Sequence, residues 1–309
     1  MNIDQLKALQ LDIIKKNKTC NKISTICVLS TLLITTIILL YNSSEIRIII
    51  VIFIFELVFL LIIIGIIKNI INGKDIKLFY KNFKSVFVLN ALKKNFDNIV
   101  YNPLTGFDIN FVNSIGLFNT GDRFYSNDFV SGKYKNINFE QSDIHIEEKR
   151  ETKDRDGNKE IEWVTIFMGR LMIFDFNKNF KTNIQISNNC CYIDKLPWEK
   201  SFSRVKTEDI EFNKNFCVYA ENEHDAFYIL TPAFMEKIKK INKSLNCGLM
   251  FCFVNNKLHI AVNNNEDCFE YNVFKIIDEN EIEKDIIKDM KLITNFVNEL
   301  DLDNRLFKK

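Results

Sequence analysis

Two long apolar runs near the start of the chain constrain the fold more than any other feature. They cover residues 23–41 (ISTICVLSTLLITTIILLY) and 48–67 (IIIVIFIFELVFLLIIIGII), and are 19 and 20 residues long. A helix rises 1.5 Å per residue, so each run spans about 30 Å, the thickness of a bilayer's hydrocarbon core. A secretory signal peptide has a shorter apolar core, followed by a small-residue cleavage site that is missing here. We therefore predict two transmembrane helices.

The loop between these runs and the lysines outside them predict the topology. Only six residues, NSSEIR, separate the runs, and so short a connection joins antiparallel helices. A transmembrane hairpin over residues 23–67 is therefore expected. Lysines are frequent on both outer flanks, whereas the loop holds one basic residue, Arg47. Basic residues favour the cytoplasmic side, so both termini are predicted to be cytoplasmic.

The charge distribution divides the chain further. Residues 1–22 are expected to form a basic cytosolic helix, residues 68–99 a basic juxtamembrane helix, and residues 100–309 a cytosolic domain. Residues 1–99 carry 13 basic and 6 acidic side chains, so the net charge of +1 for the whole chain hides a basic anchor and an acidic domain. This balance argues against a nucleic-acid partner. The expected partners are the lipid bilayer, and a protein or second copy of the chain contacted through the hairpin.

Glu56 is the ionisable residue inside the predicted membrane spans. An intramembrane acid either relays protons or ions, or is held by polar groups of a neighbouring helix. Folding of the hairpin would bring Glu56 level with about residue 33, next to hydroxyl groups of the first span. We favour packing, with a protonated Glu56 bonded to one of these hydroxyls; the alternative is an oligomeric channel or transporter. The hydroxyl candidates are Thr31, Thr35 and Thr36.

The cysteines predict neither a disulfide framework nor a metal site. A chain of 309 residues with a cytosolic domain is unlike the small secreted proteins that disulfides stabilise. No C-x-x-C pair is present, and no histidine lies at ligand spacing from a cysteine. We therefore expect free thiols at all eight positions: Cys20, Cys27, Cys190, Cys191, Cys217, Cys247, Cys252 and Cys268.

The cytosolic part reads as strands followed by helices. Strands are expected at 129–134, 137–146, 161–167, 170–176, 180–187 and 216–219, with residues 147–160 as a charged hairpin tip. A short helix over 107–118, a helix from Thr231-Pro232 to about Leu245, a hairpin of 249–254 and 257–262, and a helix over 281–300 complete the pattern. This order predicts an α+β domain with a mixed, mainly antiparallel sheet and flanking helices.

Several motifs resemble a bacterial membrane-anchored family catalogued as domain of unknown function 3137. They are VSGKYKNINF (130–139), VTIFMG (164–169), GRLMIFDFNK (169–178), LTPAFM (230–235) and LDNRL (302–306). The resemblance covers most of residues 70–309 and includes the layout of a membrane hairpin followed by one domain. It implies a multi-pass protein of the bacterial inner membrane. It implies no activity, so no site residue is transferred.

No recognised catalytic motif is present: the P-loop, Rossmann, metalloprotease and nucleophile-elbow patterns are all missing. Glu223-His224-Asp225 is the compact acid–histidine cluster, which we interpret as a polar turn. His145 and His259 are interpreted as residues of strands. Asp175 and Lys178 in the DFNK run are the best candidates for function, although a turn at a strand end is the favoured role.

These observations lead to one expected function and one alternative. We expect a non-catalytic, cytosol-facing module that interacts with a partner or senses a ligand, without catalytic, cofactor-binding or metal-binding residues. The alternative is a membrane-bound hydrolase or transferase that uses acids near Asp175. A deep polar pocket lined by carboxylates would favour the alternative.

Overall fold

The computed structural model describes the chain except residues 42–45, 118, 154–158, 177–182, 189–201 and 304–309. Within the long helices, the side chains of residues 38–52, 55–56, 63 and 66–72 also lie outside the description. The chain divides into two compact units. The first contains Met1–Val88 and Tyr271–Ile282, and the second contains Leu89–Glu270 and Glu283–Lys309.

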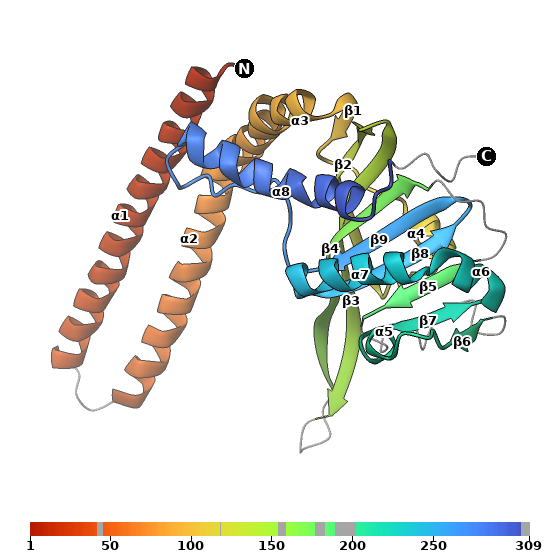
Figure 1. Cartoon of the computed structure of the whole chain (residues 1–309). Helices are drawn as coiled ribbons and strands as arrows, with labels where there is room; N and C mark the ends of the chain where they lie inside the picture. The colour runs from red at the N-terminus through yellow and green to blue at the C-terminus, as the bar shows by residue number, and fades with distance from the viewer. Residues whose placement is uncertain (42–45, 118, 154–158, 177–182, 189–201, 304–309) are drawn as a thin grey trace. The chain divides into compact units, whose positions relative to one another are not determined.

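Two long helices dominate the first unit. Helix α1 (Ile3–Tyr41) and helix α2 (Ile46–Phe83) lie side by side, and a π-helical stretch (Lys84–Val88) follows α2 (Figure 1). Neither helix is interrupted where a lysine-rich flank meets an apolar run. Among the residues that the structure describes, one helix, over Ile3–Ile37, is long and apolar enough to cross a membrane. This supports membrane anchoring, and the second span stays a prediction.

The first unit has a small core away from the predicted membrane spans. Leu6 and Ile13 of α1 and Phe79 of α2 are fully buried. The core also takes in the distant segment Tyr271–Ile282, whose Tyr271 ring stacks on Phe83 with centroids 4.9 Å apart. The first unit therefore combines the first 88 residues with a short segment from late in the sequence.

The described part of the second unit contains one antiparallel sheet of nine strands in the order β1-β2-β3-β4-β9-β8-β5-β7-β6. Strands β5, β7 and β6, at the end of this order, lie at the right of the sheet in Figure 1. The strands are β1 (Asp97–Asn102), β2 (Arg123–Tyr134), β3 (Ile137–Lys153), β4 (Lys159–Asp175), β5 (Ile184–Ser187), β6 (Ser203–Val205), β7 (Cys217–Ala220), β8 (Gly248–Val254) and β9 (Lys257–Asn263). The expected α+β class and antiparallel sheet are confirmed.

Short and medium helices accompany this sheet. They are α3 (Leu89–Asn95), α4 (Ile109–Ile115), α5 (Ile210–Asn215), α6 (Glu223–Ile229), α7 (Pro232–Leu245) and α8 (Glu279–Glu299). Local signals explain several boundaries: the Thr231 side chain caps α7, and Gly116 ends α4 in the left-handed conformation.

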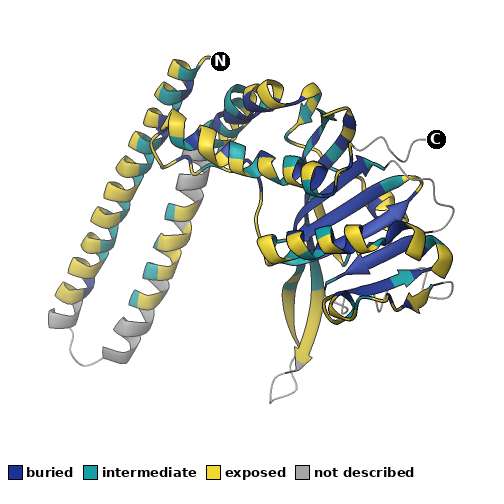
Figure 2. Ribbon diagram, in the orientation of Figure 1, coloured by how far each residue is buried: buried dark blue, intermediate teal, exposed yellow. Residues whose placement is uncertain are grey.

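Both faces of the central strands are buried, as Figure 2 shows by colour. On one face, Ile144 of β3 and Ile173 of β4 belong to a core completed by Ile115 of α4. On the other face, Phe174 lies against Phe296 of α8, with ring centroids 6.4 Å apart. Residues of β3 therefore alternate between two apolar layers.

Three expectations about the second unit are wrong. The strands predicted at 161–167 and 170–176 are one strand, β4, and the expected tip at 147–160 lies mostly within β3 and β4. The juxtamembrane helix ends at Asn95, and β1 replaces its last residues. Cys217 is disulfide-bonded. The described free thiols are Cys20, Cys27, Cys247, Cys252 and Cys268.

Candidate functional site

The residues of the DFNK run do not gather into a polar site in the described structure. Asp175 is the last residue of β4, opposite Lys257 of β9, and accepts a hydrogen bond from Asn138 at 2.7 Å. Lys178 lies outside the described residues. Asp175 therefore lies at a strand end, as expected from the sequence.

The three histidines lie apart. His224 is exposed in the first turn of α6, which Asn222 caps, so the Glu223-His224-Asp225 cluster is a helix start. His145 of β3 is half-buried, 3.1 Å from the Thr165 hydroxyl. His259 of β9 is buried, and burial lowers its pKa to about 4. It is therefore a neutral core residue at physiological pH.

Glu56 lies in α2, and its side chain is outside the described residues. The threonine hydroxyls proposed as its partners donate to carbonyl groups of their own helix: Thr31 to Val28 at 2.8 Å, and Thr35 to Thr31 at 3.0 Å. A hydroxyl oxygen that donates in this way can still accept a hydrogen bond from a protonated carboxyl. The packing interpretation stays a prediction.

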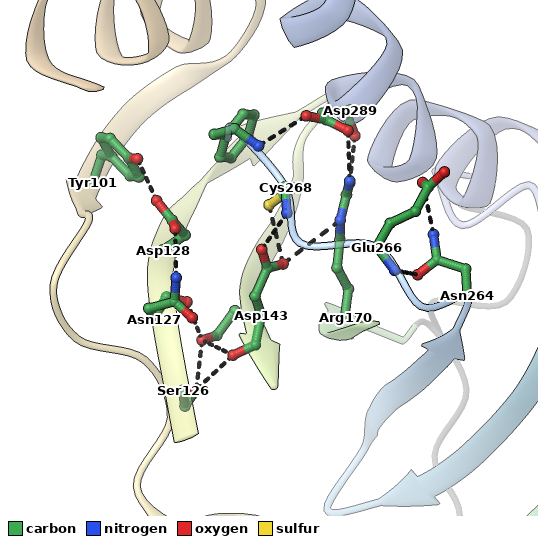
Figure 3. A network of polar contacts seen from close by, with 12 residues as sticks. Tyr101, Ser126, Asn127, Asp128, Asp143, Arg170, Asn264, Glu266, Cys268 and Asp289 are labelled. Carbon is green, nitrogen blue, oxygen red and sulfur yellow. Dashed lines mark hydrogen bonds and ion pairs between the residues drawn. The ribbon is translucent and has the colours of Figure 1, made fainter. Parts of the chain in front are cut away.

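The strongest concentration of buried polar groups lies elsewhere, beneath α8. Arg170 of β4 is almost fully buried, and its two terminal nitrogens donate to Asp289 of α8 (Figure 3). Nη1 reaches the Asp289 backbone oxygen at 2.6 Å, and Nη2 reaches its Oδ1 at 2.8 Å. Asp289 also accepts from the backbone N–H of Phe269 at 2.9 Å. This network ties the helix to the sheet and to the loop after β9.

Asp143 of β3 is the centre of the network. It is the cross-strand partner of Arg170, whose Nε lies 3.7 Å from its Oδ1. Its Oδ2 accepts from the backbone N–H of Cys268 at 2.6 Å, and its Oδ1 accepts from the Cys268 thiol at 3.0 Å. The loop that carries Cys268 is therefore held directly over β3.

Burial controls the protonation of these groups. Desolvation raises the pKa of Asp143 well above its usual value, the Asp267 carboxyl raises it further, and Arg170 opposes this change. Desolvation also raises the pKa of the Cys268 thiol, against the attraction of Arg170. Cys268 is therefore a neutral thiol at physiological pH, and a neutral thiol is a poor nucleophile.

A second buried acid, Asp128, lies beside Asp143. It occupies a bulge in β2, where the register shifts between Asn127 and Val130, and its φ of 53° is in the left-handed region. The hydroxyl of Tyr101 donates to its Oδ1 at 2.5 Å, and the Asn127 amide donates to its Oδ2 at 2.8 Å. The bulge therefore turns this carboxylate toward Asp143.

Three carboxylates converge at this point. Asp128, Asp143 and Asp267 each offer one oxygen, and these oxygens all lie within 4.8 Å of one another. Asp267 is exposed in the loop after β9, while the other two acids are buried. Hard cations such as Ca²⁺ and Mg²⁺ prefer such oxygen ligands.

Buried polar atoms without a hydrogen-bond partner flank the same point. In the described residues, the buried side-chain atoms that lack a partner are Nε2 and Oε1 of Gln141, and Nε of Arg170. Gln141 precedes Asp143 by two residues on β3, and Arg170 is the partner of Asp143 on β4. The unsatisfied atoms therefore adjoin Asp143 along the strand and across it.

From the sequence we expected no metal-binding residues, and none of the three aspartates belongs to a recognised motif. The three aspartates come from β2, β3 and a loop, so their spacing forms no motif. One signal was present: the apolar residues of β3 change from odd positions, Ile137 and Phe139, to even positions, Ile144 and Ile146. Gln141 and Asp143 continue the odd positions, so they are polar residues on a buried face.

Comparisons with known proteins assign no activity to this site. A family model described as "Protein of unknown function (DUF3137)" matches residues 165–302. This match covers less than half of the chain and does not reach residues 130–139, so the resemblance is supported over a shorter stretch than expected. No curated protein matches the chain.

One solved structure similar to the chain is the crystal structure of the mycobacterial trehalose monomycolate transport factor A, TtfA. The identity is 8% and the TM-score is 0.36, over 72% of this chain and 95% of that one. A likeness this distant carries no argument about function. The comparisons support a domain of unknown function within residues 165–302, which contain Arg170, Asp267, Cys268 and Asp289 of the polar network.

Proposed function

We propose that this chain is a membrane-anchored, non-catalytic module, in which a transmembrane hairpin of α1 and α2 holds a ligand-binding or partner-binding domain at the cytosolic face of the bacterial inner membrane. The observation that carries the hairpin is the position of Gln10. Its amide donates to the backbone oxygens of Val273 at 3.0 Å and Lys275 at 2.5 Å, and its oxygen accepts from the N–H of Ile277 at 3.1 Å. This contact supports a position of the start of α1 and the segment Tyr271–Ile282 on the same side of a membrane, as an even number of crossings between them would give.

Two further features support this reading. Lys16 of α1 pairs with Asp75 of α2 at 2.7 Å, outside the predicted spans, so these ends of the two helices are also neighbours. Large apolar side chains of both spans are exposed, as expected of a surface that lipid covers. They are Ile23, Ile26, Leu29, Leu32, Leu33, Ile34, Ile37, Ile54, Val58, Phe59, Leu61 and Ile62.

Orientation is the point on which two observations disagree. The lysine-rich flanks place the domain in the cytosol, whereas the disulfide at Cys217 is typical of an oxidising compartment. We follow the lysines, because they lie at both ends of the hairpin. Protease added to intact spheroplasts should then leave the domain uncut, and cleave it only after lysis. Cleavage in intact spheroplasts would show that the domain lies on the outer side of the membrane.

A binding role fits the polar site better than catalysis does. Asp143 and Arg170 are buried, and the Cys268 thiol is held neutral by burial. Crosslinking in intact membranes, followed by purification of the full chain, should recover a reproducible partner. Hydrolase or transferase activity of the purified chain that disappears in an Asp143→Asn variant would favour the enzyme alternative instead.

A further inference from the structure

We propose that Asp128, Asp143 and Asp267 bind a divalent cation of the calcium class, with Gln141 as a neutral oxygen ligand. The inference deepens the binding role proposed above by naming its ligand, and rests on that role. It does not depend on the orientation in the membrane. Four features of the second unit support it: the convergence of carboxylates, the unsatisfied Gln141, the spacing of the oxygens, and the excess of acidic groups.

The first step is the position of Gln141. Gln141 and Asp143 are alternate residues of β3, so their side chains rise from the same face of the sheet. Their partners on β2 are Val130 and Asn127, which flank the bulge that contains Asp128. Gln141 therefore lies on the same face of β3 as Asp143 and next to the bulge.

The second step is the cost of leaving Gln141 unsatisfied. Its side chain has no exposed surface, and neither its amide nitrogen nor its oxygen has a hydrogen-bond partner among the described residues. Native proteins rarely bury an amide in this way, and an ion or water in contact with it is the usual explanation. A hydrated cation satisfies all three unpartnered atoms, since the metal takes Oε1, and its water ligands accept from Gln141 Nε2 and Arg170 Nε.

The third step is geometry. Oxygens on opposite sides of a calcium ion, with bonds of about 2.3–2.6 Å, lie about 4.6–5.2 Å apart. The three carboxylate oxygens all lie within 4.8 Å of one another, so they fit around one ion of this size.

The fourth step is charge. Arg170 supplies one positive charge within ion-pair distance of Asp143 and Asp289. Two more acids, Asp128 and Asp267, lie beside Asp143, so acidic groups exceed basic ones. Buried carboxylates in excess are stable only when they are protonated or bind cations. One divalent cation can balance the charge of several carboxylates, whereas one proton neutralises only one of them.

Titration calorimetry of the full chain in detergent micelles tests the proposal, with calcium chloride as the titrant at constant ionic strength. We expect one ion per chain with a dissociation constant below about 1 mM, the weak limit of protein calcium sites. Asp267→Asn, which removes the charge of the exposed ligand while keeping the size of its side chain, should weaken binding at least about tenfold. The matched control is Glu266→Gln in the same loop, which should bind as the wild type does.

Gln141→Leu separates the proposed site from a packing defect. If Gln141 is a ligand, this variant weakens calcium binding and loses part of the calcium-dependent rise in the thermal midpoint. If the amide is merely unsatisfied, the variant raises the midpoint without calcium and binds the ion as tightly as the wild type. The second result overturns the role of Gln141. Absence of a calcium signal from the folded wild type at about 10 mM, well above the expected dissociation constant, overturns the whole site.

Discussion

The side-chain amide of Gln10 donates to the backbone oxygen of Val273 at 3.0 Å, across 263 residues of sequence. Together with its bonds to Lys275 and Ile277, this contact satisfies three backbone groups of a segment that has no helix or strand before α8 begins at Glu279. One buried glutamine therefore replaces the ladder of hydrogen bonds that a strand would provide.

Substitution of Gln10 by leucine should loosen this segment. The variant removes the bonds of the Val273 carbonyl and the Ile277 N–H to the glutamine, at a cost of about 2–3 kcal/mol. The Lys275 carbonyl still accepts from the Tyr271 hydroxyl at 2.8 Å. Hydrogen exchange of the full chain in micelles should show faster exchange at the Ile277 amide. Thr19→Val, on the exposed side of the same helix, serves as the control. Unchanged protection at Ile277 would contradict the assigned contact.

His259 should make stability fall in mild acid. Its pKa is about 4 in the folded protein, below the ordinary value of 6.5, because burial disfavours the imidazolium. Between these values the unfolded chain binds the proton and the folded chain does not, so the stabilisation is complete above pH 6.5 and is lost as the pH falls toward 4. The loss at pH 4 is about 3 kcal/mol.

Urea unfolding at several pH values, compared between wild type and His259→Gln, measures this effect. Glutamine does not titrate and can still donate to the Cys252 carbonyl, which lies 3.3 Å from the histidine Nδ1. The variant should show a flatter dependence on pH than the wild type. Parallel curves for wild type and His259→Gln would show that His259 does not stay neutral.

Arg170→Lys should destabilise the second unit although it keeps the charge. The guanidinium contacts both the backbone oxygen and the carboxylate of Asp289 with separate nitrogens, and a single ammonium cannot match this fork. We expect a loss of about 2 kcal/mol in the free energy of unfolding. Arg123→Lys is the control, since Arg123 is exposed and pairs with Glu147 at 3.4 Å. Similar losses for both variants would argue against a special role of the buried pair.

Gly169→Ala should be costly, because β9 passes too close for a side chain. A Cβ at this position would lie 2.0 Å from the Val262 backbone oxygen, and the φ of 157° is unfavourable for alanine. Separation of β4 from β9 to relieve this contact should cost about 2–3 kcal/mol. Gly65→Ala, where no atom lies within 4 Å, controls for the exchange itself. Thermal unfolding of both variants measures the difference, and equal midpoints would contradict the close approach.

Sequence reasoning worked where a short stretch decides the structure. The Thr231 cap with Pro232 defines the start of α7, and Asn255-Asn256 defines the turn between β8 and β9, because each feature depends on neighbours a few residues away. The order of strands does not depend on local chemistry. Strand β4 pairs with β9, and β5 lies between β8 and β7, through contacts that no spacing reveals.

The polar site could not be predicted from the sequence for the same reason: its residues come from distant parts of the chain. Asp128 faces Asp143 because of a bulge in β2, and Asp267 joins them from a loop more than 120 residues later. The change of the apolar positions in β3 from odd to even did indicate that both faces are buried. A strand buried on both sides that still carries Gln141 and Asp143 must place them against polar partners.

The segment Tyr271–Ile282 leaves the second unit and returns to it, after contributing to the first. The chain therefore passes between the two units three times, at residues 88–89, 270–271 and 282–283. Truncation of the N-terminal 88 residues would remove Gln10, Phe79 and Phe83, which contact this segment, and expose Val273 and Ile277. A fragment made by deleting only these helices would thus expose an apolar patch on residues 271–282. Preparations of it should aggregate unless these residues are replaced as well.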